Sequence, residues 1–230
     1  MAFSDVHSPR FLADFARSMR GQSCTGVDLV VMAGDLIDKG KLSGLDPVLR
    51  IVRRECGDSV LVGVFGNEEY HQLRDKLRSL YPMIRWLEDE VLYGEADGCR
   101  YAVVGTPGAL DRPTSWQARN LPGIEAVYRE RPQTVARLIR EARSRASVVM
   151  LVSHYGLTRL TLEGEPRRIW PYLYSSLMER VIVEEKPDLA IHGHAHKGKR
   201  MAVVDGVPVY NVAFPVWRRP VVIDLKCAGK

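Results

Sequence analysis

The chain has few cysteines and no long apolar run. Its four cysteines, Cys24, Cys56, Cys99 and Cys227, include no Cys-x-x-Cys pair, which argues against a zinc knuckle or a redox motif. A chain of 230 residues can form a sizeable core without disulfides, so we interpret all four as isolated thiols. No segment reaches the roughly 18 apolar residues of a membrane helix, and the start lacks a signal-peptide pattern. We therefore expect a cytoplasmic protein that makes no membrane contact.

Side-chain amides are also scarce, and the positive charge is modest. Asn occurs three times and Gln four times, while arginine outnumbers lysine. This pattern is typical of a thermophile, although GC-rich coding would also favour arginine. The net charge of +5 permits nucleic-acid binding without indicating it, because the arginines are scattered rather than gathered in one block. Nothing in the sequence indicates how many subunits assemble.

The remaining composition, 46% hydrophobic and 27% charged, predicts one globular domain over residues 1–230. Apolar segments rich in Val, Ile and Leu predict buried strands within 27–35, 59–67, 147–154 and 188–194. Segments with apolar residues at helical spacing predict helices within 8–21, 44–56, 69–81, 131–145 and 174–186. Such alternation is typical of an α/β fold with largely parallel strands.

Two segments depart from this alternation. Residues 91–105 and 200–213 each place Asp-Gly between short alternating runs, which is a strong signal for a β-hairpin. Antiparallel strands therefore join the parallel ones. The pattern is compatible with one mixed sheet, or with two sheets packed face to face and helices outside.

Polar side chains gather where the predicted strands end. Such residues follow five strands: Asp5 and His7; Asp35 and Asp38; Asn67, Glu68 and Glu69; His154; and His192, His194 and His196. Any one of them could be a cap or a turn residue, but independent caps would not concentrate five of the six histidines in these stretches. Because ligands gather at the carboxyl ends of strands in α/β sheets, we expect one shared site there.

The ligand types and their spacing predict a metal centre. In Asp5-x-His7 and His194-x-His196, alternate residues of an extended chain face the same side. Imidazole, carboxylate and amide oxygen together suit manganese, iron, zinc or cobalt. The set exceeds what one ion needs, so it predicts two ions about 3.5–4 Å apart. Two ions at this distance can stabilise both the attacking and the leaving oxygen of a phosphoryl transfer.

Together these motifs resemble one family. The matching pieces are Asp5-x-His7, Gly34-Asp35-x-x-Asp38, Gly66-Asn67-x-Glu69, His154 and Gly193-His194-x-His196, in an order that resembles the calcineurin-like metallophosphoesterases across nearly the whole chain. The resemblance implies a four-layer sandwich, with two mixed β-sheets packed face to face and helices on the outer faces. It also implies a dinuclear metal site.

Residue roles follow from the resemblance by position. They assign Asp5, His7 and His196 to one metal and Asn67, His154 and His194 to the other, with Asp35 bridging. The catalytic set is then Asp35, Asn67, Glu68 and His154. The resemblance implies hydrolysis of a phosphate ester, nucleotides included, by a hydroxide that bridges the two metals.

The chain departs from the family pattern at several places. Glu68 stands where many members have a histidine beside the leaving group. Nearby cations favour an ionised carboxylate, so we expect Glu68 to be a poor proton donor. It could hold an arginine, engage a metal through water or repel a dianionic monoester, which favours diesters. His192 is additional to the usual motif and is interpreted as a buried structural residue. Asn211 lacks the Pro and Gly that often follow it, and the first strand is short.

Other residues are assigned to the surroundings of the site. Asp38, Glu69 and His192 are placed beside the ligands. The loops 106–133 and 155–175 mix aromatic residues, prolines and arginines, so they could form a phosphate-binding mouth or ordinary surface connections. From these loops we select Tyr155, Arg167 and Arg168.

The sequence therefore predicts a metal-dependent hydrolase of phosphate esters that favours diesters over monoesters. One alternative is a nuclease acting on DNA or RNA, which the basic charge allows. Another is a binding scaffold that has kept the fold and lost the chemistry. Retention of every expected ligand position argues against the scaffold.

Overall fold

The computed structural model describes residues 1–225 and 227, and it contains two β-sheets. The strands are β1 (Ala2–Phe3), β2 (Leu29–Met32), β3 (Val60–Val64), β4 (Ile84–Leu87), β5 (Glu90–Ala96), β6 (Cys99–Thr106), β7 (Val148–Ser153), β8 (Leu189–His192), β9 (Met201–Val204) and β10 (Val207–Asn211). One sheet has the order β1-β2-β3-β4 and the other β5-β6-β7-β8-β10-β9.

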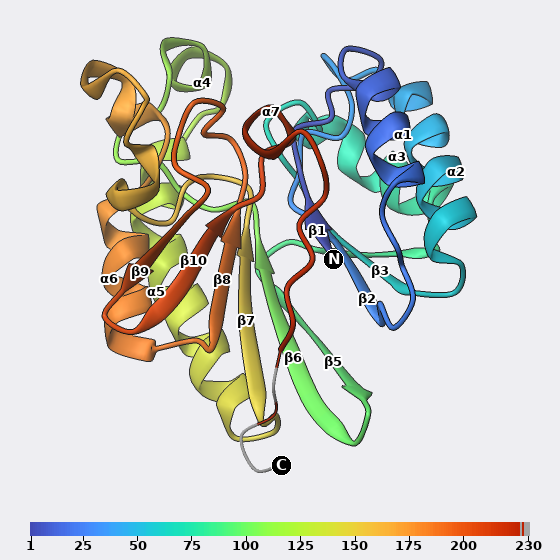
Figure 1. Cartoon of the computed structure of the whole chain (residues 1–230). Coiled ribbons are helices and arrows are strands. Elements are labelled where there is room, and N and C mark those ends of the chain that lie inside the picture. Colours follow the sequence, from blue (N-terminus) through green and yellow to red (C-terminus); the bar gives the residue numbers. More distant parts are fainter. Residues whose placement is uncertain (226, 228–230) are drawn as a thin grey trace.

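Helices cover the outer face of each sheet (Figure 1). The α-helices are α1 (Leu12–Arg20), α2 (Leu45–Cys56), α3 (Arg74–Leu80), α4 (Ser115–Asn120), α5 (Ile124–Arg143), α6 (Ser176–Glu185) and α7 (Phe214–Trp217). Short 3-10 helices are η1 (Leu42–Gly44), η2 (His71–Leu73), η3 (Arg159–Leu162) and η4 (Arg167–Tyr172). Figure 1 shows α1, α2 and α3 outside the four-stranded sheet and α5 and α6 outside the six-stranded one. The predicted four-layer sandwich is confirmed.

Strand alternation explains how the layers are held together. In β2, Val30 and Met32 belong to the core under α1 and α2, whereas Val31 belongs to the core between the two sheets. Successive side chains of a strand point to opposite faces, so a strand between two layers must be apolar at every position. This is why the buried strands appear in the sequence as continuous apolar runs.

The sheets differ in the direction of their strands. The three strand pairs of the four-stranded sheet are all parallel. Ala2 of β1 also forms an isolated antiparallel bridge with Val221. The six-stranded sheet is mixed, with antiparallel pairs β5–β6 and β9–β10. The predicted Asp-Gly hairpins are therefore confirmed, while the prediction of two mixed sheets holds for the larger sheet alone.

Several boundaries differ from the predicted ones. The helix predicted over 131–145 begins at Ile124, and Pro132 lies buried inside it. The loop 106–133 therefore contains the first turns of α5 as well as α4, which Thr114 caps through a hydrogen bond from the Gln117 N–H. Strand β4 was not predicted, because Arg85 interrupts its short apolar run.

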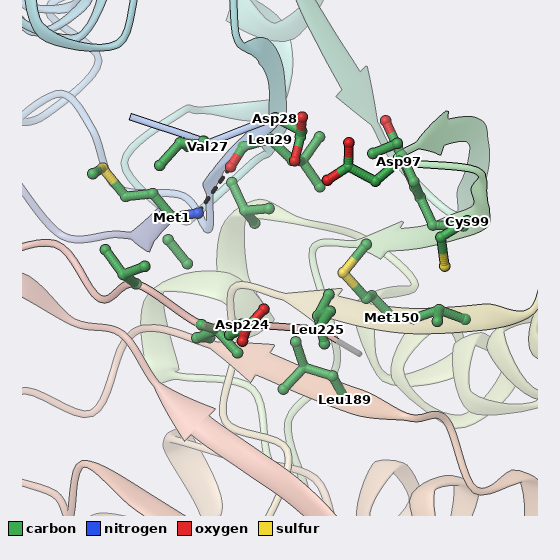
Figure 2. Close-up of a pocket in the computed structure, with 18 of the residues that line it drawn as sticks. Met1, Val27, Asp28, Leu29, Asp97, Cys99, Met150, Leu189, Asp224 and Leu225 are labelled. Carbon is green, nitrogen blue, oxygen red and sulfur yellow. Dashed lines mark hydrogen bonds between the residues drawn. The ribbon is translucent and has the colours of Figure 1, made fainter. Parts of the chain in front are cut away.

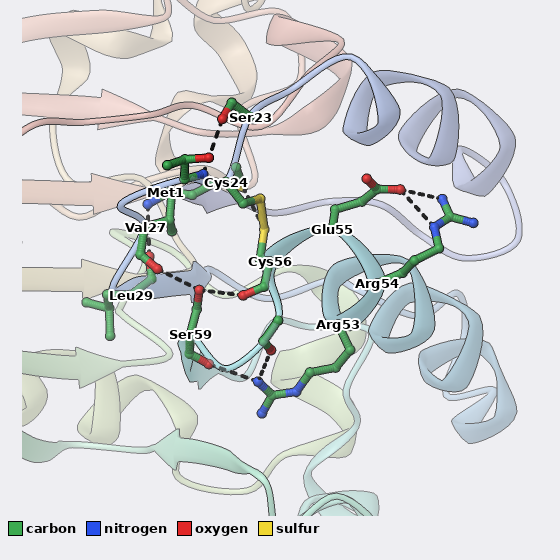
Figure 3. Close-up of a disulfide and its surroundings, with 12 residues drawn as sticks. Met1, Ser23, Cys24, Val27, Leu29, Arg53, Arg54, Glu55, Cys56 and Ser59 are labelled. Atoms are coloured by element: carbon green, nitrogen blue, oxygen red, sulfur yellow. Dashed lines mark hydrogen bonds and ion pairs between the residues drawn. A yellow bond between two sulfur atoms is a disulfide. The ribbon is translucent and has the colours of Figure 1, made fainter.

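The cysteines are not isolated thiols. Disulfides join Cys24 to Cys56 and Cys99 to Cys227, so the interpretation from the sequence was wrong. The partners are 32 and 128 residues apart, and their pairing depends on how the sheets bring distant segments together. Figure 3 shows Cys24–Cys56 between the segments that precede β2 and β3, where the Ser59 hydroxyl is hydrogen-bonded to the Cys56 carbonyl.

A cavity of about 590 Å³ lies between the sheets. Figure 2 shows Leu29, Met150 and Leu189 among its walls, together with the amino group of Met1, which donates a hydrogen bond to the Leu29 carbonyl. Its lining includes the segment before β2 and the turn between β5 and β6, so it lies at the opposite end of the strands from the predicted site. Among residues 1–225 and 227, no helix is long and apolar enough to cross a bilayer.

Candidate metal centre

Two loops approach each other closely at the carboxyl ends of β2 and β3. A Cβ atom on Gly34 would lie 2.7 Å from both the Gly66 nitrogen and the His154 ring, and one on Gly66 would overlap Asp35. Real Cβ atoms do not approach other atoms this closely, so glycine is required at both positions. The two glycines allow Asp35 and Asn67, which follow them, to sit side by side.

Four residues of the predicted site have left-handed backbone conformations. Asp5, His7, Asp35 and His194 have φ angles of 56°, 42°, 51° and 68°. Such angles are unfavourable for residues with a side chain, and they persist where the surroundings impose them. Their concentration at the carboxyl ends of strands from both sheets indicates that backbone strain is used here to direct side chains toward a common point.

Asp35 lies at the middle of the cluster. Its Oδ2 atom is 3.8 Å from His7 Nε2 and 3.5 Å from His154 Nε2, while its Oδ1 accepts a hydrogen bond of 2.8 Å from the Glu68 N–H. One carboxylate oxygen therefore faces two histidines from two different strands. Asn67 joins the group, since its Oδ1 lies 3.2 Å from His154 Nε2.

The histidine rings are oriented by backbone carbonyls. His154 Nδ1 lies 2.9 Å from the Ala33 carbonyl, and His194 Nε2 lies 3.3 Å from that of Tyr172. A ring nitrogen that faces a carbonyl carries the proton, so the other nitrogen of each ring has a free lone pair. Burial lowers the pKa of His154 to about 4 and that of His194 to about 3, which keeps both rings neutral.

The second group is built around Asp5. Its Oδ1 accepts a hydrogen bond of 2.9 Å from His196 Nε2, and its Oδ2 accepts one of 2.9 Å from the His194 N–H. Burial acts to raise the pKa of Asp5, but the side chains of His196 and His7 bring it well below the ordinary value. Asp5 is therefore an ionised, fully buried carboxylate.

Unbalanced negative charge surrounds Asp35. Burial raises its pKa well above the ordinary value, and the charges of Glu69 and Asp5 raise it further. Buried carboxylates this close to one another need a cation or a proton. His7 offers a nitrogen ligand for such a cation, because its buried Nε2 has no hydrogen-bond partner among the described residues.

These features fit divalent metals. The ligand atoms of three residue groups lie within 4.8 Å of one another: Asp5, His7 and His196; Asp35, His154 and His194; and His7, Asp35 and Glu68. The separations of 3.5–3.8 Å around Asp35 are too long for hydrogen bonds, but they suit atoms that share an ion bound about 2 Å from each. The predicted ligands are thus brought together, and their metal-binding roles stay predictions.

Glu69 serves the fold of the site. It is buried, and its carboxylate accepts N–H bonds of 2.8 Å from Gly66, Asp35 and Leu36 and one of 3.3 Å from Ile37. These donors come from both loops of the close approach. Glu69 therefore fixes the position of Asp35 through its backbone.

Tyr155 and His192 also lie beside the cluster. The Tyr155 ring centroid is 4.9 Å from that of His194, and its hydroxyl accepts a hydrogen bond from Gln117 of α4. His192 is fully buried, with Nε2 at 2.8 Å from the Thr161 hydroxyl and Nδ1 at 2.8 Å from the Gly193 carbonyl. Both ring nitrogens of His192 have protein partners, which agrees with a structural residue.

Asp38, Arg167 and Arg168 are the remaining residues that the sequence assigned to the surroundings of the site. Asp38 is half-buried after the Asp35 loop and belongs to none of the three groups. Arg167 and Arg168 are exposed on η4, with the Arg167 guanidinium over the Trp170 ring at 5.9 Å. Their element, η4, reaches the cluster through the Tyr172 carbonyl that faces His194.

Sequence reasoning gave no role to three supporting residues, although the resemblance drew attention to Asn211. The Ser4 hydroxyl donates to Asp5, Gln117 holds Tyr155, and the Asn211 amide donates a 2.7 Å hydrogen bond to the Ala195 carbonyl between two predicted ligands. Ser4 could have been selected from its place next to Asp5. The partners of Gln117 and Asn211 are distant in sequence, so no local pattern indicates them.

Comparisons with known proteins concern the family and the fold. A family model described as calcineurin-like phosphoesterase matches residues 1–198. No curated protein sequence matches the chain significantly.

Solved structures share the fold. The phosphopantetheinyl hydrolase (PptH) of Mycobacterium tuberculosis has 17% identity and a TM-score of 0.73, with 100% of this chain and 97% of that chain covered. A dimetal phosphatase from Danio rerio has 14% identity and a TM-score of 0.60, with 91% and 85% covered. GAP50 of Plasmodium, described as the anchor in the inner membrane complex, has 11% identity and a TM-score of 0.58, with 93% and 73% covered. At these identities the likeness concerns the fold alone.

Proposed function

Because the chain belongs to the calcineurin-like phosphoesterase family, we propose that it is a two-metal hydrolase that prefers phosphodiesters to phosphomonoesters. The family uses divalent metals on phosphate esters, so the coarser function is that of a metal-dependent phosphoesterase. The observation that carries the two-metal proposal is the position of Asp35 Oδ2, which faces His7 at 3.8 Å and His154 at 3.5 Å.

The residues of the chain would divide the work. Asp5, His7 and His196 would hold one ion, Asn67, His154 and His194 the other, and Asp35 would lie between them. Divalent ions bound there lower the pKa of a bound water and offset charge on the phosphoryl oxygens. Burial favours this chemistry, because it keeps His154 and His194 neutral and strengthens electrostatic interactions within the site.

The preference for diesters rests on Glu68. Its carboxylate lies within 4.8 Å of the ligand atoms of His7 and Asp35, so it adds negative charge where a phosphoryl group would bind. A monoester dianion is repelled by this charge more strongly than a diester monoanion. The likeness to a phosphopantetheinyl hydrolase makes phosphopantetheinyl esters suitable members of the test panel.

The test is an activity panel on metal-stripped protein reloaded with Mn²⁺, Fe²⁺, Zn²⁺ or Co²⁺. It compares bis-p-nitrophenyl phosphate, p-nitrophenyl phosphate, nucleotide esters, a phosphopantetheinyl ester, DNA and RNA. We expect metal-dependent hydrolysis with a higher kcat/KM for diesters. Hydrolysis of DNA or RNA above all small esters would favour the nuclease alternative.

The matched variants are Asp35→Asn and Asp58→Asn, the latter at an exposed residue between α2 and β3. Asp35→Asn should lower kcat about 100-fold or more, the scale of losing a key electrostatic group, and Asp58→Asn should not change it. Anomalous scattering from manganese-loaded crystals should give two peaks flanking Asp35. A single peak would contradict the dinuclear proposal, and absence of any metal-dependent hydrolysis would favour a scaffold.

A further inference from the structure

Resting on the proposed metal centre, we infer that Glu68 is an additional ligand of the metal held by His7 and Asp35. Glu68 stands where the resemblance leads one to expect a histidine, so the inference goes beyond what the family pattern implies. The sequence left several roles open for Glu68. The inference selects contact with a metal rather than contact with an arginine.

Two independent observations support a cation next to Glu68. The ligand atoms of His7, Asp35 and Glu68 lie within 4.8 Å of one another. The His7 ring is buried, and its Nε2 has no hydrogen-bond partner within the described part of the chain. A buried ring nitrogen without a partner is costly unless something binds it, and the two carboxylates beside it are cation ligands.

The neighbouring loop fixes the direction of the Glu68 side chain. Its Oε2 accepts a hydrogen bond of 2.6 Å from the Lys39 N–H, and its own carbonyl accepts one of 3.1 Å from the Gly40 N–H. Its N–H donates to Asp35 at 2.8 Å. Side chain and backbone are therefore both held, and Oε1 accepts a long hydrogen bond of 3.5 Å from the Asn67 amide.

An additional carboxylate changes the charge of the centre. Glu68 places a second carboxylate within 4.8 Å of the ligand atoms of His7 and Asp35, so two negative charges repel each other there. A bound divalent ion would relieve this repulsion, whereas a neutral histidine at position 68 would not contribute to it. Carboxylate oxygen also suits harder ions than imidazole does, so this metal position should favour Mn²⁺ over Zn²⁺ relative to the other.

The experiment measures metal binding and uses Glu68→Gln. Glutamine is the same size and keeps an oxygen for the Lys39 N–H, so it removes the charge while retaining the loop contact. Mn²⁺ is titrated into metal-stripped protein and followed by calorimetry and by the electron paramagnetic resonance signal of free Mn²⁺. We expect one of two sites to weaken about 10–100-fold and the other to stay unchanged.

Three controls separate ligation from folding and from function. Glu130→Gln, at an exposed residue of α5, should leave both affinities unchanged. Glu68→Asp keeps the charge but shortens the side chain, so its loss should be smaller than that of Glu68→Gln. In a crystal of the manganese-loaded wild type, a Glu68 oxygen should lie about 2.0–2.2 Å from one metal peak.

The outcomes distinguish this inference from the proposed function. Two unchanged Mn²⁺ affinities in Glu68→Gln, or a Glu68 carboxylate directed away from both metal peaks, would overturn the inference and leave the hydrolase proposal standing. If Glu68→Gln loses one Mn²⁺ site and the wild type hydrolyses no ester, the inference is supported and the proposed function is overturned. A wild type that binds no Mn²⁺ would overturn both.

Discussion

At the residue scale, the site depends on groups that fix the ligands as much as on the ligands. The Ala33 carbonyl orients His154, and the Tyr172 carbonyl orients His194. Asp35 is held by its backbone N–H, which donates a hydrogen bond to the Glu69 carboxylate. Each support comes from a different segment of the chain. The ligand geometry is therefore set before any metal binds, and this lowers the cost of ordering side chains on binding.

Glu69 offers a direct test of this preorganisation. In Glu69→Gln, either orientation of the amide turns its NH₂ group toward two of the four backbone N–H donors that the carboxylate now accepts. We expect the free energy of unfolding to fall by roughly 2–4 kcal/mol, since charged hydrogen bonds are lost and donors are left unpaired. Metal affinity should fall about 10–100-fold, as for other residues that orient ligands.

Urea denaturation and metal titration measure these two effects. Glu184→Gln, at an exposed residue of α6, is the matched control and should change neither value. If Glu69→Gln unfolds at the wild-type urea concentration, the four N–H donors do not need a carboxylate and Glu69 is not the anchor described above.

At the element scale, the strands that carry ligands were predictable and the connections that support them were not. The buried strands β2, β3, β7 and β8 lie within the predicted ranges because continuous Val, Ile and Leu runs are needed between two layers. The polar residues directly after them gather where the carboxyl ends of strands from both sheets meet. Sequence pattern does not indicate the Lys39 N–H bond to Glu68 or the Gln117 bond to Tyr155, because each joins segments far apart in the chain.

His192 connects two such elements, and its titration should be measurable. It lies at the end of β8 and its Nε2 faces Thr161 of η3 at 2.8 Å. Burial lowers the pKa of His192 from 6.5 to about 4. Between these values the unfolded chain takes up a proton that the folded ring does not, so this ring lowers stability as the pH falls below about 6.5.

The prediction compares wild type with His192→Asn in metal-free protein. Acidification from pH 7 to pH 5 should cost the wild type about 2 kcal/mol more unfolding free energy than the variant, because asparagine does not titrate. Urea denaturation at the two pH values gives the difference directly, and other groups that titrate in this range cancel in it. Equal losses in the two proteins would mean that His192 is not buried in its neutral form.

At the scale of the whole molecule, the disulfides concern both the stability of the fold and the prediction of where the protein is located. Cys24–Cys56 joins segments within the four-stranded half, and Cys99–Cys227 ties β6 to the C-terminal segment. Disulfides are rare in cytosolic proteins except those of hyperthermophiles. The predicted cytoplasmic location therefore agrees with two disulfides only together with the thermophile interpretation, and both stay predictions.

The disulfides lead to a prediction for the protein as a whole. They connect residues 32 and 128 apart, and in the chain-entropy description each such link stabilises the fold by roughly 3–5 kcal/mol. In a chain of this size, each kcal/mol corresponds to about 2–4 °C in Tm, so full reduction should lower Tm by more than about 10 °C. Calorimetry with and without a strong reductant measures the shift, and Cys24→Ser/Cys56→Ser should show a smaller response to the reductant.

Thiol titration of the denatured, unreduced protein should find no free thiol, because the structure pairs all four cysteines. Four titratable thiols and a Tm insensitive to reductant would restore the interpretation made from the sequence.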